Sequence, residues 1–209
     1  MIKVILCDDH AVVRRGIRDT IAEAVDIQVV GEAGSYPELR EAMRKTECDV
    51  LVLDLNMPGR GGLEVLAALR DEGSLVKTLV VSMYPEDQYA IRCLRAGARG
   101  YLNKAGDPAE LVQAIRVVMQ GRKYVTPAVA EMLVDTLNAP ETEELHASLS
   151  ERELQTLQKI ASGRKLSDIA EELMLSPKTV SVYRARVLEK LHLTNNAELT
   201  VYAIRNGLV

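Results

Sequence analysis

The stretch Val50-Leu51-Val52-Leu53-Asp54-Leu55-Asn56-Met57-Pro58-Gly59 decides the fold of this chain. Its first four residues are apolar, which is typical of a strand that is buried on both faces of a parallel sheet. The run ends at Asp54, and Pro58-Gly59 then turns the chain away. Because ligands collect at the carboxyl ends of parallel strands, we expect Asp54 to lie in a binding site.

Similar apolar runs alternate with helical spacing on both sides of this stretch. Strands are predicted at residues 2–6, 27–30, 50–53, 78–81 and 101–102. Helices are predicted at residues 12–24, 36–45, 63–69, 88–96 and 108–120. This alternation predicts an α/β doubly wound five-stranded parallel sheet over residues 1–124.

The rest of the chain contains no strand pattern. Residues 125–147 are predicted to form a linker with a short helix near its start, and they carry five acidic residues and no Lys or Arg. Short helices are predicted at residues 150–162, 167–174, 177–191 and 196–206. Residues 148–209 are therefore predicted to form a small all-α domain.

The net charge of −4 conceals a mildly basic C-terminal region, in which residues 148–209 carry nine Lys and Arg against seven Asp and Glu. This excess permits a nucleic-acid partner. No apolar run approaches the roughly 20 residues that cross a membrane, and the chain enters a strand pattern without a signal peptide. We therefore expect a soluble cytoplasmic protein that makes no membrane contact.

Polar side chains follow four of the predicted strands. Asp8 and Asp9 follow the first, Asp54 the third, Ser82 the fourth and Lys104 the fifth. Three carboxylates at one edge of a sheet repel one another, and a divalent cation relieves that repulsion. Hard oxygen ligands favour Mg²⁺. With Lys104 and Ser82 nearby to bind an anion, Asp54 is predicted to attack phosphorus and form an aspartyl-phosphate.

Residues 1–124 resemble the CheY-like receiver domain of a two-component response regulator. The resemblance lies in Asp8-Asp9, Asp54 with Met57-Pro58-Gly59, Ser82, Ala96-Gly97-Ala98, Tyr101 and Lys104. It implies that a partner histidine kinase phosphorylates Asp54. It also implies that Mg²⁺ is held by Asp9, Asp54 and the backbone carbonyl of Asn56, with support from Asp8. Ser82 and Tyr101 would then form the switch that responds to the phosphoryl group. The protein would be no enzyme beyond slow self-dephosphorylation.

Residues 148–209 contain the pattern of a helix-turn-helix that runs from about Ser167 to Arg186. Ser150 and Glu153 form a capping-box pattern, and Ser176-Pro177 is typical of a helix start. On the helix that follows, Val180, Tyr183, Val187 and Leu191 are predicted to pack inward. Base contacts are predicted for Ser181, Val182 and Ala185. Phosphate contacts are predicted for Lys178, Thr179, Arg184 and Arg186.

This region resembles the LuxR-type helix-turn-helix domain, so the whole chain resembles the NarL/FixJ class of response regulators, and its GacA-like members in particular. Two positions depart from the common pattern: Tyr183 stands where many members have His, and Leu166 where many have Asn. The resemblance implies promoter DNA as a partner, a homodimer when active, and RNA polymerase as a further candidate partner. The last helix offers Leu199, Tyr202 and Ala203 either to a dimer interface or to the core.

Two other classes of function stay open at this point. Asp8, Asp9 and Asp54 could belong to a phosphatase or phosphotransferase, although enzymes of the haloacid-dehalogenase type space their two acids as DxD. A Rossmann dehydrogenase would need GxGxxG after the first strand, and the sequence has none there. A signalling adaptor that binds only proteins is the third reading, and Lys178 and Arg186 argue against it.

Overall fold

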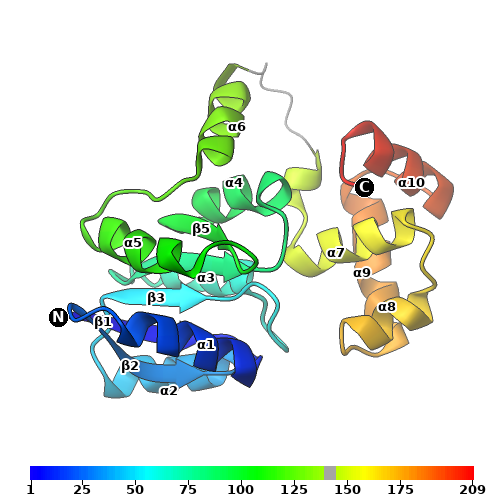
Figure 1. Ribbon diagram of the computed structural model, residues 1–209. Helices are drawn as coiled ribbons and strands as arrows, with labels where there is room; N and C mark the ends of the chain where they lie inside the picture. Colours follow the sequence, from blue (N-terminus) through cyan, green and yellow to red (C-terminus); the bar gives the residue numbers. More distant parts are fainter. Residues whose placement is uncertain (139–144) are drawn as a thin grey trace. The chain divides into compact units, whose positions relative to one another are not determined.

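The computed structural model describes residues 1–138 and 145–209 (Figure 1). The chain divides into two compact units, Met1–Ala139 and Pro140–Val209. Residues 139–144, which include three of the acidic residues of the predicted linker, lie outside the described residues.

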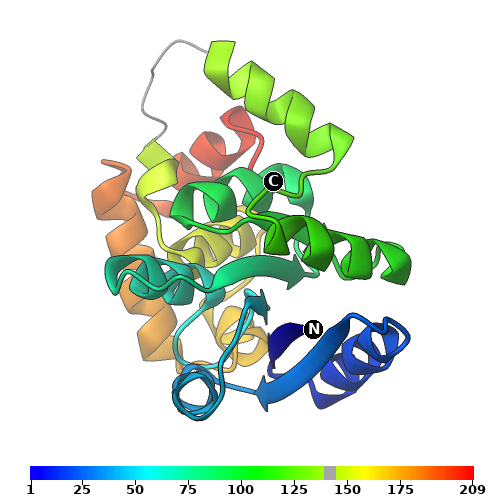
Figure 2. The ribbon, with the colours of Figure 1, turned by 90° about the vertical axis from the view of Figure 1, so that its left-hand side faces the viewer.

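The first unit is built on a parallel sheet in the strand order β2-β1-β3-β4-β5 (Figures 1 and 2). The strands are β1 (Ile2–Cys7), β2 (Ile27–Ala33), β3 (Val50–Leu53), β4 (Lys77–Ser82) and β5 (Gly100–Asn103). The helices are α1 (Ala11–Ala22), α2 (Tyr36–Lys45), α3 (Gly62–Asp71), α4 (Glu86–Ala96), α5 (Pro108–Met119) and α6 (Pro127–Asn138). The predicted doubly wound sheet is confirmed.

Alternate residues of each strand point to opposite faces, so each face of the sheet has its own apolar layer. On one face, strand side chains such as Val4, Val52 and Leu79 pack with Ile21 of α1 and Ile115 of α5. The intervening residues Ile5, Leu51, Leu53 and Val80 are also fully buried, on the face that α2, α3 and α4 cover. This burial on both faces explains why β3 reads as an unbroken apolar run.

The predicted limits of α2 and β3 agree with the structure, while β2 continues to Ala33 instead of ending at residue 30. The parallel register shifts between Val4 and Ile5, which pair with Val29 and Gly31. A Cβ on Gly31 would lie 3.3 Å from Ile5 Cγ1. Gly31 lies inside β2 and permits the close approach that carries the strand past the irregularity.

Helix α6 belongs to the first unit in the structure, whereas the sequence analysis placed residues 125–138 in the linker. Val129 of α6 is fully buried, and α6 packs against α4. The Thr126 hydroxyl, just before the helix, donates a hydrogen bond of 2.6 Å to the Glu86 carboxylate. This apolar and polar attachment to α4 explains why α6 groups with the sheet.

The second unit is all-helical, as predicted. It contains a 3₁₀ turn, η1 (Leu145–Ser148), followed by α7 (Glu151–Ala161), α8 (Leu166–Glu172), α9 (Pro177–Lys190) and α10 (Asn196–Arg205). Ser150 and Glu153 form the predicted capping box at the start of α7. Helix α7 packs against both α9 and α10, and the helix core includes Leu157, Val180, Val187, Leu199 and Ala203. None of the helices in the two described ranges combines the length and apolar composition needed to cross a bilayer.

Candidate functional site

Asp54 lies in a buried ionic cluster at the carboxyl edge of the sheet. Lys104 Nζ is 2.9 Å from Asp54 Oδ2 and 2.6 Å from Asp8 Oδ2. The three side chains are 7% exposed or less. The structure therefore brings together three of the residues that the sequence analysis selected at separate strand ends.

The register of the parallel sheet produces this convergence. Cys7 pairs with Leu53, so Asp8 and Asp54 leave neighbouring strands at the same level. The Asp54 N–H donates to the Cys7 carbonyl at 2.8 Å, and the Lys104 N–H donates to the Ser82 carbonyl at 2.8 Å. These backbone bonds extend the sheet pairing by one residue, which fixes where the functional side chains begin.

The environment of Asp54 disfavours its charged form. Burial is the largest cause and raises the pKa of Asp54, and the negative charge of Asp8 raises it further. Lys104 and the backbone N–H of Asn56 act in the opposite direction. The Leu55 N–H also donates to Asp54 Oδ1 at 2.8 Å. On balance the pKa of Asp54 stays raised, so a further positive charge at this edge would favour the carboxylate form.

The same edge forms a site that is consistent with a divalent cation. Ligand atoms of Asp8, Asp9, His10 and Asp54 all lie within 4.8 Å of one another. Within the described part of the chain, Asp8 Oδ2 and Asp9 Oδ1 are buried atoms that accept no hydrogen bond of normal geometry. Buried carboxylate oxygens of this kind are suitable ligands for a hard cation. The sequence analysis did not select His10, although it directly follows the acidic pair.

Ser82 is the last residue of β4 and Tyr101 the second residue of β5, and both are fully buried. Their link is the backbone of Tyr84, whose N–H donates to Ser82 Oγ at 3.3 Å. The Tyr84 carbonyl accepts from the Tyr101 hydroxyl at 2.7 Å and from Asn103 Nδ2 at 3.2 Å. Burial raises the pKa of Tyr101, so its hydroxyl remains a donor. Asn103 was not predicted, and no sequence motif distinguishes it.

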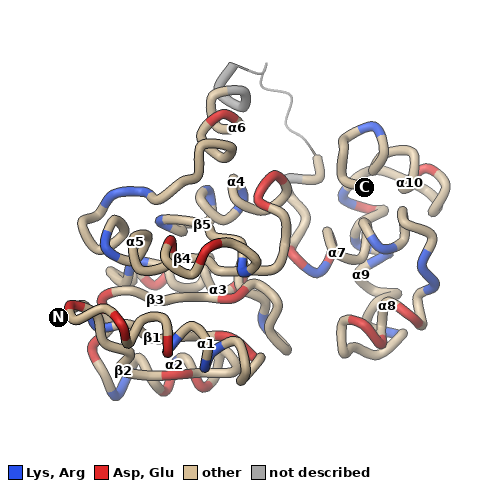
Figure 3. The backbone as a smooth tube through the Cα atoms, viewed as in Figure 1, with Lys and Arg blue, Asp and Glu red and all other residues tan. Residues whose placement is uncertain are grey.

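In the second unit, α8 and α9 form the helix-turn-helix that was predicted. Met174, in the connection, adopts a left-handed backbone with φ of 53°. Ser176 caps α9 by accepting from the Thr179 N–H at 3.1 Å. Figure 3 shows Lys and Arg along α9 and acidic residues on α8. Four of the nine Lys and Arg residues in 148–209 lie on α9, the helix expected to enter the DNA groove.

The limits of this helix-turn-helix differ from the predicted span of Ser167 to Arg186. Helix α8 already begins at Leu166, so Ser167 is its second residue rather than its first. Ser167 is exposed, and its hydroxyl donates to Asp168 Oδ1 at 2.8 Å. At the other end, α9 continues past Arg186 to Lys190.

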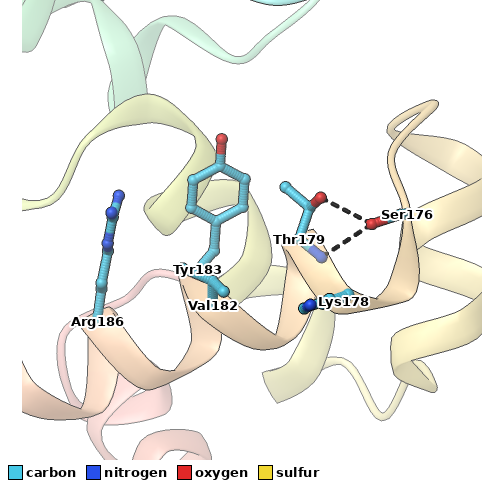
Figure 4. A pocket seen from close by; sticks show the side chains of 6 residues that line it. All are labelled: Ser176, Lys178, Thr179, Val182, Tyr183 and Arg186. Atoms are coloured by element: carbon cyan, nitrogen blue, oxygen red, sulfur yellow. Dashed lines mark hydrogen bonds between the residues drawn. The ribbon is translucent and has the colours of Figure 1, made fainter.

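A shallow groove runs along α9 (Figure 4) and is lined by Ser176, Lys178, Thr179, Val182, Tyr183 and Arg186. Thr179, Tyr183 and Arg186 stand on the same side of the helix. The prediction that Tyr183 packs inward was wrong, because the side chain is only half-buried and lines this groove. The other residues predicted to pack inward, Val180, Val187 and Leu191, are all buried.

The other side chains selected for DNA differ in their exposure. Thr179 and Arg184 are half-buried, whereas the rest are exposed: Lys178, Ser181, Val182, Ala185 and Arg186. Thr179 Oγ1 lies 2.8 Å from Ser176 Oγ. Arg184 Nε donates to Asn196 Oδ1 of α10 at 2.6 Å. Arg184 is thus engaged within the domain, while Lys178 and Arg186 present their charge to solvent.

Comparisons with known proteins agree with both units. The response regulator receiver domain family matches residues 4–116, and the luxR family of bacterial regulatory proteins matches residues 147–203. The chain is 42% identical over 209 residues to the response regulator UvrY of Escherichia coli K12, covering all of this chain and 96% of UvrY. It is 40% identical over 210 residues to the response regulator GacA of Pseudomonas aeruginosa PAO1, covering all of this chain and 98% of GacA.

The fold is also similar to solved structures of the response regulator RcsB. RcsB of Salmonella enterica serovar Typhimurium, bound to promoter rprA in the presence of the phosphomimetic BeF₃⁻, aligns with a TM-score of 0.62 and 25% identity, covering 96% of this chain and 97% of RcsB. A structure of two RcsB dimers bound to two parallel DNAs aligns with a TM-score of 0.61 and 26% identity, with the same coverage. Response regulators of this kind are typically transcription factors rather than enzymes. The chain belongs to the two-component response regulators that join a receiver domain to a LuxR-type helix-turn-helix DNA-binding domain.

Proposed function

We propose that Asp54 accepts a phosphoryl group from a phosphohistidine of a partner sensor kinase, and that this event controls dimerisation and promoter binding by the second unit. The observation that supports the proposal is the buried cluster in which Lys104 lies 2.9 Å from Asp54 and 2.6 Å from Asp8. A carboxylate beside a fixed cation and buried acidic ligands has what an aspartyl-phosphate needs.

In the transfer step, an Asp54 carboxylate oxygen attacks phosphorus and the bond from phosphorus to the kinase imidazole nitrogen breaks. The electron pair of that bond stays on the imidazole. Asp8, Asp9, Asp54 and the carbonyl of Asn56 are the proposed ligands of Mg²⁺, which neutralises charge on the transferred group. Lys104 supplies the second positive charge. No residue has to act as a general acid, because the leaving imidazole takes up a proton from water.

The phosphoryl group then acts on the switch residues. It replaces the single negative charge of the Asp54 carboxylate with about −1.5 to −2 charges and presents three acceptor oxygens. The Ser82 hydroxyl turns toward those oxygens, which withdraws the acceptor that the Tyr84 N–H now uses. Tyr101 and Asn103 move with the Tyr84 carbonyl that they share. The β4–α4 loop is thus a two-state element that the phosphoryl group biases.

The second unit supplies the output. Lys178 and Arg186 contact phosphates, with Thr179 and Arg184 as supporting groups, and Ser181, Val182 and Ala185 approach base edges. The partners are a sensor histidine kinase, promoter DNA, a second copy of this chain when active, and RNA polymerase. Such a regulator acts in the cytoplasm, and its only turnover is slow self-dephosphorylation.

The test is phosphorylation by acetyl phosphate with Mg²⁺, followed by intact mass and light scattering. Wild-type protein should gain one phosphoryl group and shift toward a dimer, while Asp54→Ala should do neither. An equal mass gain in both proteins would show that Asp54 is not the acceptor. Genome-wide mapping of bound DNA for the same two proteins then tests the output, since Asp54→Ala should lose phosphorylation-dependent sites.

A further inference from the structure

We propose that His10 is a nitrogen ligand of the receiver's cation site, so that this site binds a first-row transition ion such as Mn²⁺ more tightly than Mg²⁺. The inference rests on the proposed function and concerns which cation serves it. The site keeps the ability to take Mg²⁺ through its oxygen ligands, without the imidazole. The imidazole adds selectivity that a pocket of oxygen ligands lacks.

The geometry places the imidazole inside the ligand cluster. His10 Nδ1 lies 2.7 Å from Asp9 Oδ1 and 3.4 Å from Asp8 Oδ1. No ligand atom of the four-residue cluster is more than 4.8 Å from another. In an octahedron with bonds of about 2.1 Å, neighbouring ligands stand about 3.0 Å apart and opposite ligands about 4.2 Å. His10 and Asp9 are therefore spaced as neighbours, and small shifts bring the whole cluster into range.

The backbone holds His10 in this position. The His10 N–H donates to Asp8 Oδ1 at 2.8 Å, which closes the turn between β1 and α1. His10 is also the N-cap of α1, with an extended backbone at φ −88° and ψ 101°. The Arg14 guanidinium, one turn further along α1, donates to the Asp8 carbonyl. These bonds fix the backbone of His10 beside the acidic pair, and the ring itself approaches Asp9 and Asp8 through Nδ1.

The hydrogen bonding of the Asp8 and Asp9 carboxylates also indicates that these oxygens can bind a cation in addition to their present contacts. Asp8 is 3% exposed, and among the described residues its Oδ2 has no hydrogen bond of normal geometry, although Lys104 Nζ is 2.6 Å away. Asp9 Oδ1 is in the same condition beside His10. Two buried carboxylate oxygens with contacts but without well-formed hydrogen bonds are atoms that a cation can satisfy.

The ligand chemistry then determines for which cation His10 increases the binding affinity. Mg²⁺ prefers hard oxygen ligands and keeps its water readily, so an imidazole offers it little. First-row transition ions accept imidazole nitrogen together with carboxylate oxygen. The side chain of His10 is 55% exposed, which leaves the ring free to turn about its bond to the backbone and complete the site.

The experiment measures cation binding directly, by electron paramagnetic resonance of Mn²⁺ and by competition with Mg²⁺, on the full chain at one neutral pH. Three proteins are compared: wild type, His10→Ala and His192→Ala. His192 is an exposed histidine of the second unit, so its variant controls for binding to any surface imidazole. Electron spin-echo modulation of bound Mn²⁺ reports a nitrogen ligand by its ¹⁴N coupling.

Wild type and His192→Ala should show the ¹⁴N coupling, and His10→Ala should lose it. His10→Ala should weaken Mn²⁺ binding by at least about tenfold, because even outer-sphere partners are worth about 10-fold to 100-fold in metal affinity. Its Mg²⁺ affinity should change by less than about twofold, because Mg²⁺ uses oxygen ligands. Equal losses for both ions, or Mn²⁺ bound without ¹⁴N coupling in wild type, would overturn the inference.

The outcome separates this inference from the proposed function. If Asp54 is phosphorylated in Mg²⁺ but His10→Ala leaves Mn²⁺ binding unchanged, His10 is only a hydrogen-bond partner of Asp9 and the inference fails alone. If neither cation binds wild type and Asp54 gains no phosphoryl group, the proposed function fails with it. His10→Gln adds a check on folding, since it keeps a polar side chain but removes the imidazole.

Discussion

Gly62, the first residue of α3, lies so close to Asp54 that a Cβ on it would stand 2.5 Å from the Asp54 carbonyl oxygen. The same atom would lie 2.8 Å from Leu55 Cα, so backbone blocks it on two sides. Helix α3 therefore presses against the very residues that carry the candidate phosphoacceptor. A side chain at this position must displace either the helix or the Asp54 loop.

Gly62→Ala should lower the free energy of unfolding of the first unit by about 1–3 kcal/mol, the usual cost of overpacking. It should also weaken cation binding, because Asp54 moves. Gly16→Ala in α1 is the matched control, since a Cβ there meets nothing within 4 Å. The control should gain up to about 1 kcal/mol, as Ala is the better helix former. Urea unfolding measures the free energy of unfolding of both variants, and equal changes in the two would contradict the close contact.

Lys104→Met should destabilise the first unit by about 3–5 kcal/mol at neutral pH, because it leaves two buried carboxylates without their cation. The loss should shrink as the pH falls, since Asp54, whose pKa is already raised, then takes up a proton more readily. Mg²⁺ should stabilise Lys104→Met more than wild type, because the ion replaces the missing charge. Thermal unfolding with and without Mg²⁺ measures this stabilisation. An equal rise in melting temperature for Lys104→Met and wild type would contradict the prediction.

Asp54→Asn should stabilise the protein at neutral pH. Burial raises the pKa of Asp54 in the folded state, so the folded protein disfavours the charged form, and that cost is present above the folded pKa. The cost disappears as the pH falls through the folded pKa toward the ordinary value of 3.8. The advantage of Asp54→Asn should therefore decrease with falling pH in denaturant titrations. If the stability gain of Asp54→Asn instead grew as the pH fell, the pKa of Asp54 would be lowered in the folded state rather than raised.

Glu153 should make the second unit acid-sensitive. Although burial opposes ionisation, hydrogen bonds from Lys190 and Ser150 hold the pKa of Glu153 below its usual 4.5. Lys190 Nζ lies 2.6 Å from Glu153 Oε2, which ties the end of α9 to the start of α7. This stabilisation is complete above pH 4.5 and is lost as the pH falls toward the lower folded pKa. Glu153→Gln should remove that part of the acid dependence, as followed by circular dichroism between neutral and acidic pH.

Arg186→Ala should reduce the salt dependence of DNA binding more than Arg184→Ala does. Each phosphate contact contributes about 0.9 to the slope of log K against log salt. Arg186 is exposed beside the groove, so its removal should lower the slope by about that amount. Arg184 is bonded to Asn196, so its loss should mainly weaken the packing of α9 against α10. Fluorescence anisotropy at several salt concentrations distinguishes them, and equal slopes would contradict this assignment.

Much of the fold could be predicted because local patterns and tertiary burial agree. The unbroken apolar run before Asp54 follows from burial of β3 on both faces, and the caps at Ser150 and Ser176 are local devices. Asp8, Asp54 and Lys104 lie together because the strand register brings the carboxyl ends of their strands to one edge of the sheet. Polar residues directly after apolar runs are enough to predict that edge.

Other features depend on contacts between distant segments. Helix α6 joins the first unit through Val129 and Thr126, and no pattern within residues 125–138 specifies that partner. Tyr183 has the helical spacing of the buried residues Val180 and Val187. It lies at the edge of that apolar face, however, and its ring lines the groove. Asn103 matters only because β5 carries it to the Tyr84 carbonyl.

The single lysine in the acidic cluster has a consequence for the lifetime of the signal. Asp8, Asp9 and Asp54 carry three negative charges against one from Lys104, so a divalent ion restores neutrality. A phosphoryl group makes the site more negative again and so increases its attraction for that ion. Thermodynamic reciprocity requires the converse, that the ion favours the phosphoryl group by the same factor. Under the proposed function, the pocket would therefore respond to a kinase event and to the supply of a metal ion together, and it would bind each less tightly without the other.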